Sequence, residues 1–140
     1  MQIVDGNAAD IELTDRLYIA DRILPDIRER LKQWYQVQAK DIITGRCAWY
    51  TMSTGYRPVS IHITDARRRW GSCSSKGTLN FSWRIIMAPM DIVDYVIVHE
   101  LVHLDLPDHS RNFWKKVRNV MPDYAVRRDW LKEHAYLLTW

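Results

Sequence analysis

The sequence has few cysteines and no long apolar run. Cys47 and Cys73 are the two cysteines of its 140 residues, and two isolated cysteines are not the disulfide framework of a small secreted domain. No run reaches the roughly 18 apolar residues that a membrane-spanning helix needs. The first ten residues also lack the basic and apolar regions of a signal peptide. We therefore expect a cytoplasmic protein with no membrane partner.

Repeats, low-complexity segments and linkers are also lacking, which favours a single domain over residues 1–140. The chain is 47% hydrophobic and 26% charged, an ordinary globular composition that can supply a core. Its net charge of +3 is mildly basic. Such a charge permits contact with nucleic acid or acidic partners but does not argue for it. The oligomeric state is left open.

The N-terminal part, residues 1–57, is predicted to be helical. Residues 1 to about 12 resemble a loose leader, and apolar residues from Leu13 to about Ala39 fall near helical spacing. Pro25 interrupts this run, and a helix restarting at Asp26 fits the preference for proline at a helix start. A second helix is expected from 41 to about 54, ended by Gly55.

In residues 58–140 the spacing of apolar residues first changes to the two-residue period of strands and then returns to the longer period of helices. Residues 59–64 alternate between apolar and polar, which predicts a half-buried strand with an exposed His62. Residues 67–72 and 78–84 are expected to pair as an antiparallel hairpin across the turn 74–77. Asp91, with Asp94 three residues later, is expected to cap an apolar helix that runs to about Leu104. Helices over 110–120 and 124–138 follow, so the predicted class is α+β.

The apolar helix carries His99, Glu100 and His103 as an HExxH motif. Four helical residues turn by about 400°, so the two histidines share one face and can reach a single ion. Zinc would lower the pKa of a bound water and polarise the scissile carbonyl, and Glu100 would act as general base. A catalytic zinc usually has three protein ligands. His109, after a turn at Pro107, is the natural third, although it could instead be a surface histidine.

Several further motifs occur in one order: RWGSC (Arg69–Cys73), SSKG, NFSWR (Asn80–Arg84), MAP, VHELVHL, HSRNFW (His109–Trp114) and MPDY (Met121–Tyr124). In this order they closely resemble the motifs of the YgjP-like metallopeptidases, which are related to the SprT-like and WLM zincin-type peptidases. The resemblance implies a compact zincin-like fold, with an active-site helix packed on a small sheet. It also implies one zinc ion on His99, His103 and His109, with Glu100 as the base.

The resemblance further implies that an edge strand near Arg69, Trp70, Gly71 and Ser72 receives a peptide or unfolded-protein substrate. Some family members accompany restriction or DNA-processing systems, and SprT-like relatives cleave proteins crosslinked to DNA, so a nucleic-acid-associated substrate is compatible with it. The N-terminal 55 or so residues match less clearly and could form a substrate-specific cap.

Other side chains have a functional and a structural interpretation. Tyr124 and His134 could stabilise a tetrahedral oxyanion, although packing or surface roles are the commoner alternative. Trp83, with Trp70, could line a substrate wall or pack across the hairpin. Cys73 is a weak candidate ligand beside three histidines. The basic run 67–69 could contact an acidic ligand or protect a sheet edge.

Two other functions share the histidine pattern. A metal-dependent endoribonuclease family has three histidines at the same spacing, but the residue after its first histidine is usually glycine, where this chain has Glu100. A non-catalytic binding module stabilised by zinc would need four closed ligands, and the sequence offers three good ones. A zinc metallopeptidase is therefore the leading prediction.

Overall fold

The N-terminal part contains a small sheet. The computed structural model describes residues 2–4, 11–13, 17–20 and 26–138, and the chain forms two compact units, residues 1–37 and 38–140. In the first unit, β1 (Gln2–Val4) pairs parallel with β3 (Leu17–Ala20), and β2 (Ile11–Leu13) pairs antiparallel with it. The predicted loose leader and the helix from Leu13 are therefore wrong. A short apolar run is compatible with the spacing of either a helix or a strand, and pairing with neighbouring strands decides which of the two forms.

One long helix, α1 (Ile27–Thr54), replaces the two that were expected. No proline or glycine occurs between 38 and 44, so nothing breaks the helix there. Pro25 lies outside the described residues, and the helix begins close to Asp26 as predicted. Its predicted end is confirmed, because Gly55 adopts a φ of 81° that favours glycine.

The second unit contains a mixed three-stranded sheet in the order β4-β6-β5. The strand β4 (Ser60–Thr64) lies parallel to β6 (Thr78–Ser82), and β5 (Gly71–Cys73) lies antiparallel to it. The predicted hairpin is confirmed, with Gly77 at a φ of 86° in its turn. The first strand of the hairpin, β5, is limited to Gly71–Cys73, and residues 67–70 precede it as a loop. The prediction of a strand from Arg67 is therefore wrong. The strand β5 is an edge of the sheet.

The strand β6 is shorter than the predicted 78–84. Residues Trp83–Met87 turn into a short 3₁₀ helix, η2, and the Ser82 side chain accepts a hydrogen bond from the Arg84 amide. The indole of Trp83 is fully buried and donates to Asp65 Oδ1 at 2.7 Å. The core-packing interpretation of Trp83 is thus confirmed.

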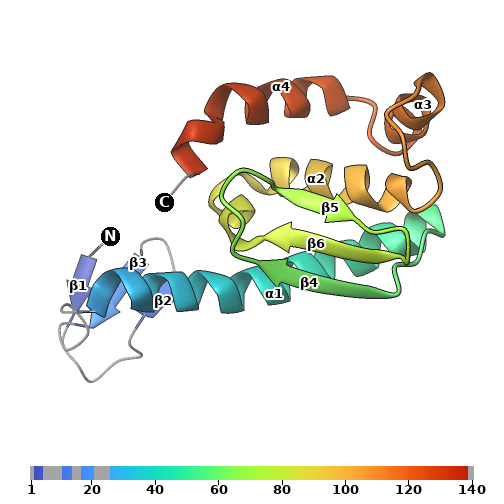
Figure 1. Ribbon diagram of the computed structural model, residues 1–140. Helices are drawn as coiled ribbons and strands as arrows, with labels where there is room; N and C mark the ends of the chain where they lie inside the picture. The colour runs from blue at the N-terminus through green and yellow to red at the C-terminus, as the bar shows by residue number, and fades with distance from the viewer. Residues whose placement is uncertain (1, 5–10, 14–16, 21–25, 139–140) are drawn as a thin grey trace. The chain divides into compact units, whose positions relative to one another are not determined.

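Three helices complete the unit: α2 (Met90–His103), α3 (Arg111–Val120) and α4 (Tyr124–His134), the last extended by η3 (Ala135–Leu138). Helix α2 packs against β5, α3 and α4 (Figure 1). The predicted cap at Asp91 is wrong, because the helix begins after Pro89 without a side-chain cap. Asp94 instead accepts hydrogen bonds from Arg46 and Tyr50 of α1.

The core of this unit surrounds α2, which is buried on nearly all sides because it is apolar nearly all round. Its fully buried side chains come from α1, β6, η2, α2 and α3 and include Ile43, Cys47, Leu79, Phe81, Ile85, Ile97, Val98, Leu101, Val102, Phe113 and Val117. Among the described residues, no helix has the length and apolar character needed to cross a membrane.

Candidate metal centre

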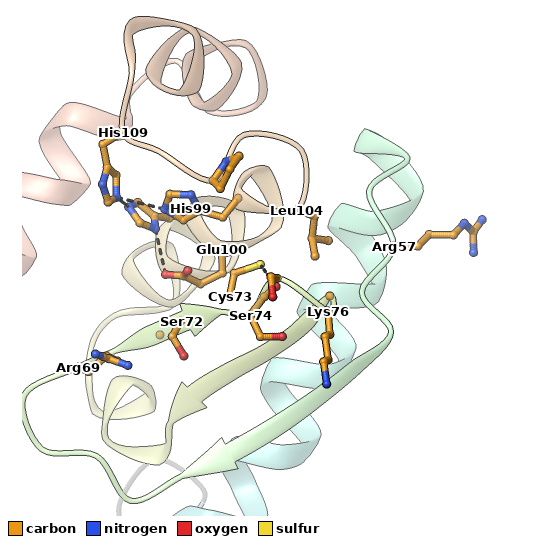
Figure 2. Close-up of a pocket in the computed structure, with 15 residues that line it drawn as sticks. Arg57, Arg69, Ser72, Cys73, Ser74, Lys76, His99, Glu100, Leu104 and His109 are labelled. Carbon is orange, nitrogen blue, oxygen red and sulfur yellow. Dashed lines mark hydrogen bonds and ion pairs between the residues drawn. The ribbon is translucent and has the colours of Figure 1, made fainter.

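Three histidines converge at the C-terminal end of α2. His99 and His103 lie one helical turn apart, and the loop between α2 and α3 brings His109 to them (Figure 2). The Nε2 atom of His109 lies 3.1 Å from that of His103 and 3.3 Å from that of His99. In the described part of the chain, these three residues are the one group of three or more potential ligands whose donor atoms lie close together.

Hydrogen bonds to Nδ1 set the tautomers of the two helical histidines. Nδ1 of His99 lies 2.9 Å from Oε2 of Glu100, and Nδ1 of His103 lies 2.9 Å from the carbonyl oxygen of Leu106. A carboxylate and a carbonyl accept hydrogen bonds, so each Nδ1 carries the proton and donates. The Nε2 lone pairs of His99 and His103 are thus left facing the cluster.

The pKa of His109 favours its neutral form. Burial, followed by the neighbouring His99 and His103, lowers the pKa of His109 below its usual value. Metal ligands must be deprotonated, so this shift favours coordination. The shift also follows from the cluster itself, because three imidazoles so close together cannot all be protonated.

The nitrogen atoms fit a tetrahedral zinc ion. Bonds of about 2.0–2.1 Å in a tetrahedron place neighbouring ligand atoms about 3.3–3.4 Å apart, and the observed Nε2 separations are 3.1 and 3.3 Å. Without a metal, these contacts are hydrogen bonds that need a proton on one of the Nε2 atoms; a cation would be bound by all three Nε2 lone pairs once that proton is lost. The donor set therefore fits one zinc ion with an open fourth position.

Aromatic rings hold the imidazoles in place. Phe113 stacks on His103 with ring centroids 4.3 Å apart, and Trp114 stacks on His109 at 5.9 Å. Both rings lie on the first turn of α3, which begins at Ser110 because its hydroxyl accepts a hydrogen bond from the Phe113 amide. The HSRNFW motif thus supplies one ligand, a helix cap and two supporting rings.

The carboxylate of Glu100 is buried between α2 and β5, with 5% of the residue exposed. It can lie there because the facing residue is glycine. A Cβ added to Gly71 would lie 2.9 Å from Glu100 Cγ and 3.1 Å from its Oε2. Real Cβ atoms do not approach neighbours so closely, so the position of the carboxylate depends on the missing side chain at residue 71.

The cluster opens into a cavity of about 800 Å³. Its lining comes from β5, the following turn, the end of α2 and the loop that bears His109, with basic side chains at the rim (Figure 2). The lining residues are Arg57, Arg69, Gly71, Ser72, Cys73, Ser74, Ser75, Lys76, Gly77, His99, Glu100, His103, Leu104, Pro107 and His109. Burial and the charge of Glu100 raise the pKa of the Cys73 thiol.

Arg69, Gly71 and Ser72 line the same cavity as the histidine cluster, and their role in binding substrate stays a prediction. Trp70 is half-buried and does not line this cavity. Neither does Tyr124, whose ring stacks on Trp114 at 5.3 Å. His134 contacts Trp130, both through the Trp130 carbonyl and by ring stacking. An oxyanion role for Tyr124 and His134 stays a prediction that these contacts do not support.

Sequence reasoning missed other parts of the site. Arg57 and Lys76 line the cavity. Arg57 lies in no motif, and the SSKG motif that contains Lys76 was given no role beyond a turn. The carbonyl of Leu106, which fixes the His103 tautomer, has no sequence signal at all. Gly71 was noted only as part of a substrate strand, and its contact with Glu100 depends on the packing of β5 against α2.

The fold and the site together define an α+β protein with a zincin-like architecture. The chain belongs to the YgjP-like family: the model described as "YgjP-like, metallopeptidase domain" matches residues 7–134. The fold is similar to that of the metallopeptidase zymogen abylysin from Pyrococcus abyssi, with a TM-score of 0.54 and 22% identity over 66% of this chain and 90% of that one. The comparison with curated proteins gives no significant match.

Proposed function

We propose that this protein is a zinc-dependent peptidase that hydrolyses peptide bonds, with Glu100 as its general base. One observation carries the proposal: three imidazole nitrogens converge beside a buried carboxylate in one open cavity. Membership of a metallopeptidase family and the zincin-like fold support it.

Each residue has a distinct role in this proposal. His99, His103 and His109 would hold one zinc ion per chain, which supplies a Lewis acid and lowers the pKa of water toward about 7. Glu100 accepts a proton from the attacking water and passes it to the leaving nitrogen. Its hydrogen bond with His99 and its contact with Gly71 keep the carboxylate oriented toward the cavity.

The substrate would bind along β5. This strand is at an edge of the sheet, so its outer hydrogen-bonding groups can pair with an extended peptide. Gly71 and Ser72 of β5 line the cavity beside Glu100. Arg69 at the rim would contact the peptide or its acidic side chains. An extended peptide on this edge passes directly beside the histidine cluster.

The other two interpretations fit the site less well. A structural zinc module needs four closed ligands, whereas the described residues supply three histidines that face a cavity. A ribonuclease with the same spacing gives no reason for a carboxylate buried against Gly71. No observation in the structure favours either alternative.

The test compares Glu100→Gln with the unchanged chain. We expect about one zinc per chain in both and a fall in peptide hydrolysis of about 10²- to 10⁴-fold in the variant, the usual contribution of a general base. His103→Ala should instead lose the metal. An unstructured protein and an RNA are supplied as separate substrates. Full activity of Glu100→Gln would refute the role of Glu100, and cleavage of RNA alone would refute the peptidase.

A further inference from the structure

The C-terminal helices form one of two basic regions in the second unit. Residues 111–134 contain seven Lys or Arg against three Asp or Glu, a net charge of +4. The whole chain has a net charge of +3, so the remainder has −1. Residues 57–84 are also basic, with six Lys or Arg against one Asp, and three of these cations line the cavity of the candidate metal centre. The helices α3 and α4 thus carry a second basic region, which lies outside that cavity.

Part of this charge lines one shallow groove between α3 and α4. Arg111, Lys115 and Arg118 follow one another at helical spacing on α3, and Arg128 joins them from α4. The groove has a volume of about 410 Å³, and no acidic residue lines it. The three α3 side chains are exposed.

These three cations have no carboxylate partner in the described part of the chain. Two acidic residues at the start and in the middle of α4 are already paired, Asp123 with Arg127 and Asp129 with Arg128. Like charges at i and i+4 destabilise a helix by a few tenths of a kcal/mol. A row of unpaired cations therefore carries a small cost that an anionic ligand would remove.

The groove offers apolar surface as well as charge. Trp114, which lines it, stacks with His109 and with Tyr124, and the Arg128 guanidinium lies 5.5 Å from its ring centroid. Tyr124 is itself buried. A ligand that binds here therefore meets this apolar lining together with the exposed cations of α3.

We propose that this groove binds the phosphodiester backbone of a nucleic acid without reading its sequence. From Arg111 to Arg118 the helix rises about 10 Å, which is the axial length of about three phosphates of one strand. Arginine suits phosphate because its donors form a planar fork. A nucleic-acid strand has a phosphate at every nucleotide and so always presents charges at this spacing, whereas a peptide does so only where acidic residues are clustered. The proposal is independent of the peptidase assignment.

The experiment measures binding of a labelled single-stranded oligonucleotide of about 20 nucleotides to the full chain. The variant replaces Arg111, Lys115 and Arg118 by Gln. Each lost contact removes about 0.7 from the slope of log affinity against log salt, so three lost contacts should lower the slope by about 2. At about 0.1 M salt the affinity should fall about 100-fold. Circular dichroism and metal content should not change, because the three side chains are exposed.

A matched control removes the same charge elsewhere. Replacing Lys40, Arg67 and Arg68 by Gln removes three exposed cations that do not line the groove, and this variant should keep most of the affinity. A second variant, Arg111→Lys with Arg118→Lys, should also keep most of it, because the contact is electrostatic.

Three results would overturn the proposal. The first is no binding by the unchanged chain at about 50 mM salt, where phosphate contacts are strong. The second is an equal loss in the control variant, which would assign any binding to net charge. The third is equal or stronger binding of poly-glutamate of matched charge, which would make the groove a site for acidic polypeptides.

Discussion

Replacing Gly71 by alanine tests whether the packing of β5 positions the carboxylate of Glu100, the proposed general base. The new Cβ would lie 2.9 Å from Glu100 Cγ and 3.2 Å from Val96 Cγ1, where ordinary contacts begin at about 3.4 Å. Glu100 must therefore move by about 0.5 Å or more, and a misplacement of about 1 Å can cost about 100-fold in rate. We expect kcat/KM to fall about 10- to 100-fold, with about one zinc per chain retained. Overpacking should lower the free energy of unfolding by about 1–3 kcal/mol.

Peptide hydrolysis and urea unfolding are measured on four chains: unchanged, Gly71→Ala, Glu100→Gln and the double variant. If the alanine acts through Glu100, it should have little further effect on the residual activity of Glu100→Gln. Gly45→Ala is the control, because an added Cβ meets nothing there within 4 Å. That helical position should gain about 0.4–1 kcal/mol without a change in activity. An unchanged kcat/KM in Gly71→Ala would show that the added methyl group does not displace Glu100. An equal loss of activity from Gly71→Ala in the unchanged chain and in Glu100→Gln would show that it does not act through Glu100.

Two further predictions concern groups around α2. Asp94→Ala should lower the free energy of unfolding by about 1–3 kcal/mol, measured in urea, because it leaves the buried Tyr50 hydroxyl and the half-exposed Arg46 without their acceptor; an unchanged urea midpoint would contradict this. Alkylation of Cys73 by iodoacetamide should be slower than in the unfolded chain. Because burial and the charge of Glu100 raise the pKa of its thiol, the alkylation rate of the metal-free chain should rise at a higher pH than that of the unfolded chain. A midpoint at or below that of the unfolded chain would contradict the raised pKa.

Local patterns predicted the second unit better than the first. The hairpin turn before Gly77 and the end of α1 at Gly55 were recognisable, because a positive φ favours glycine. The strands at residues 2–4, 11–13 and 17–20 were missed, because runs of three or four residues are too short to show a period. Asp94 was read as a local cap, whereas its partners Arg46 and Tyr50 lie more than 40 positions away in the sequence.

The sequence by itself determined the centre of the candidate site. A spacing of four residues on a helix places His99 and His103 on one face through backbone geometry alone, and a carboxylate after the first histidine must lie beside that face. The position of His109 in the cluster, the proton on each Nδ1 and the burial of Glu100 against Gly71 were decided by the tertiary structure. These three features depend on a loop, a carbonyl and a strand that lie outside α2. Packing between elements sets their distances from the helix, and the spacing of residues along the chain does not encode that packing.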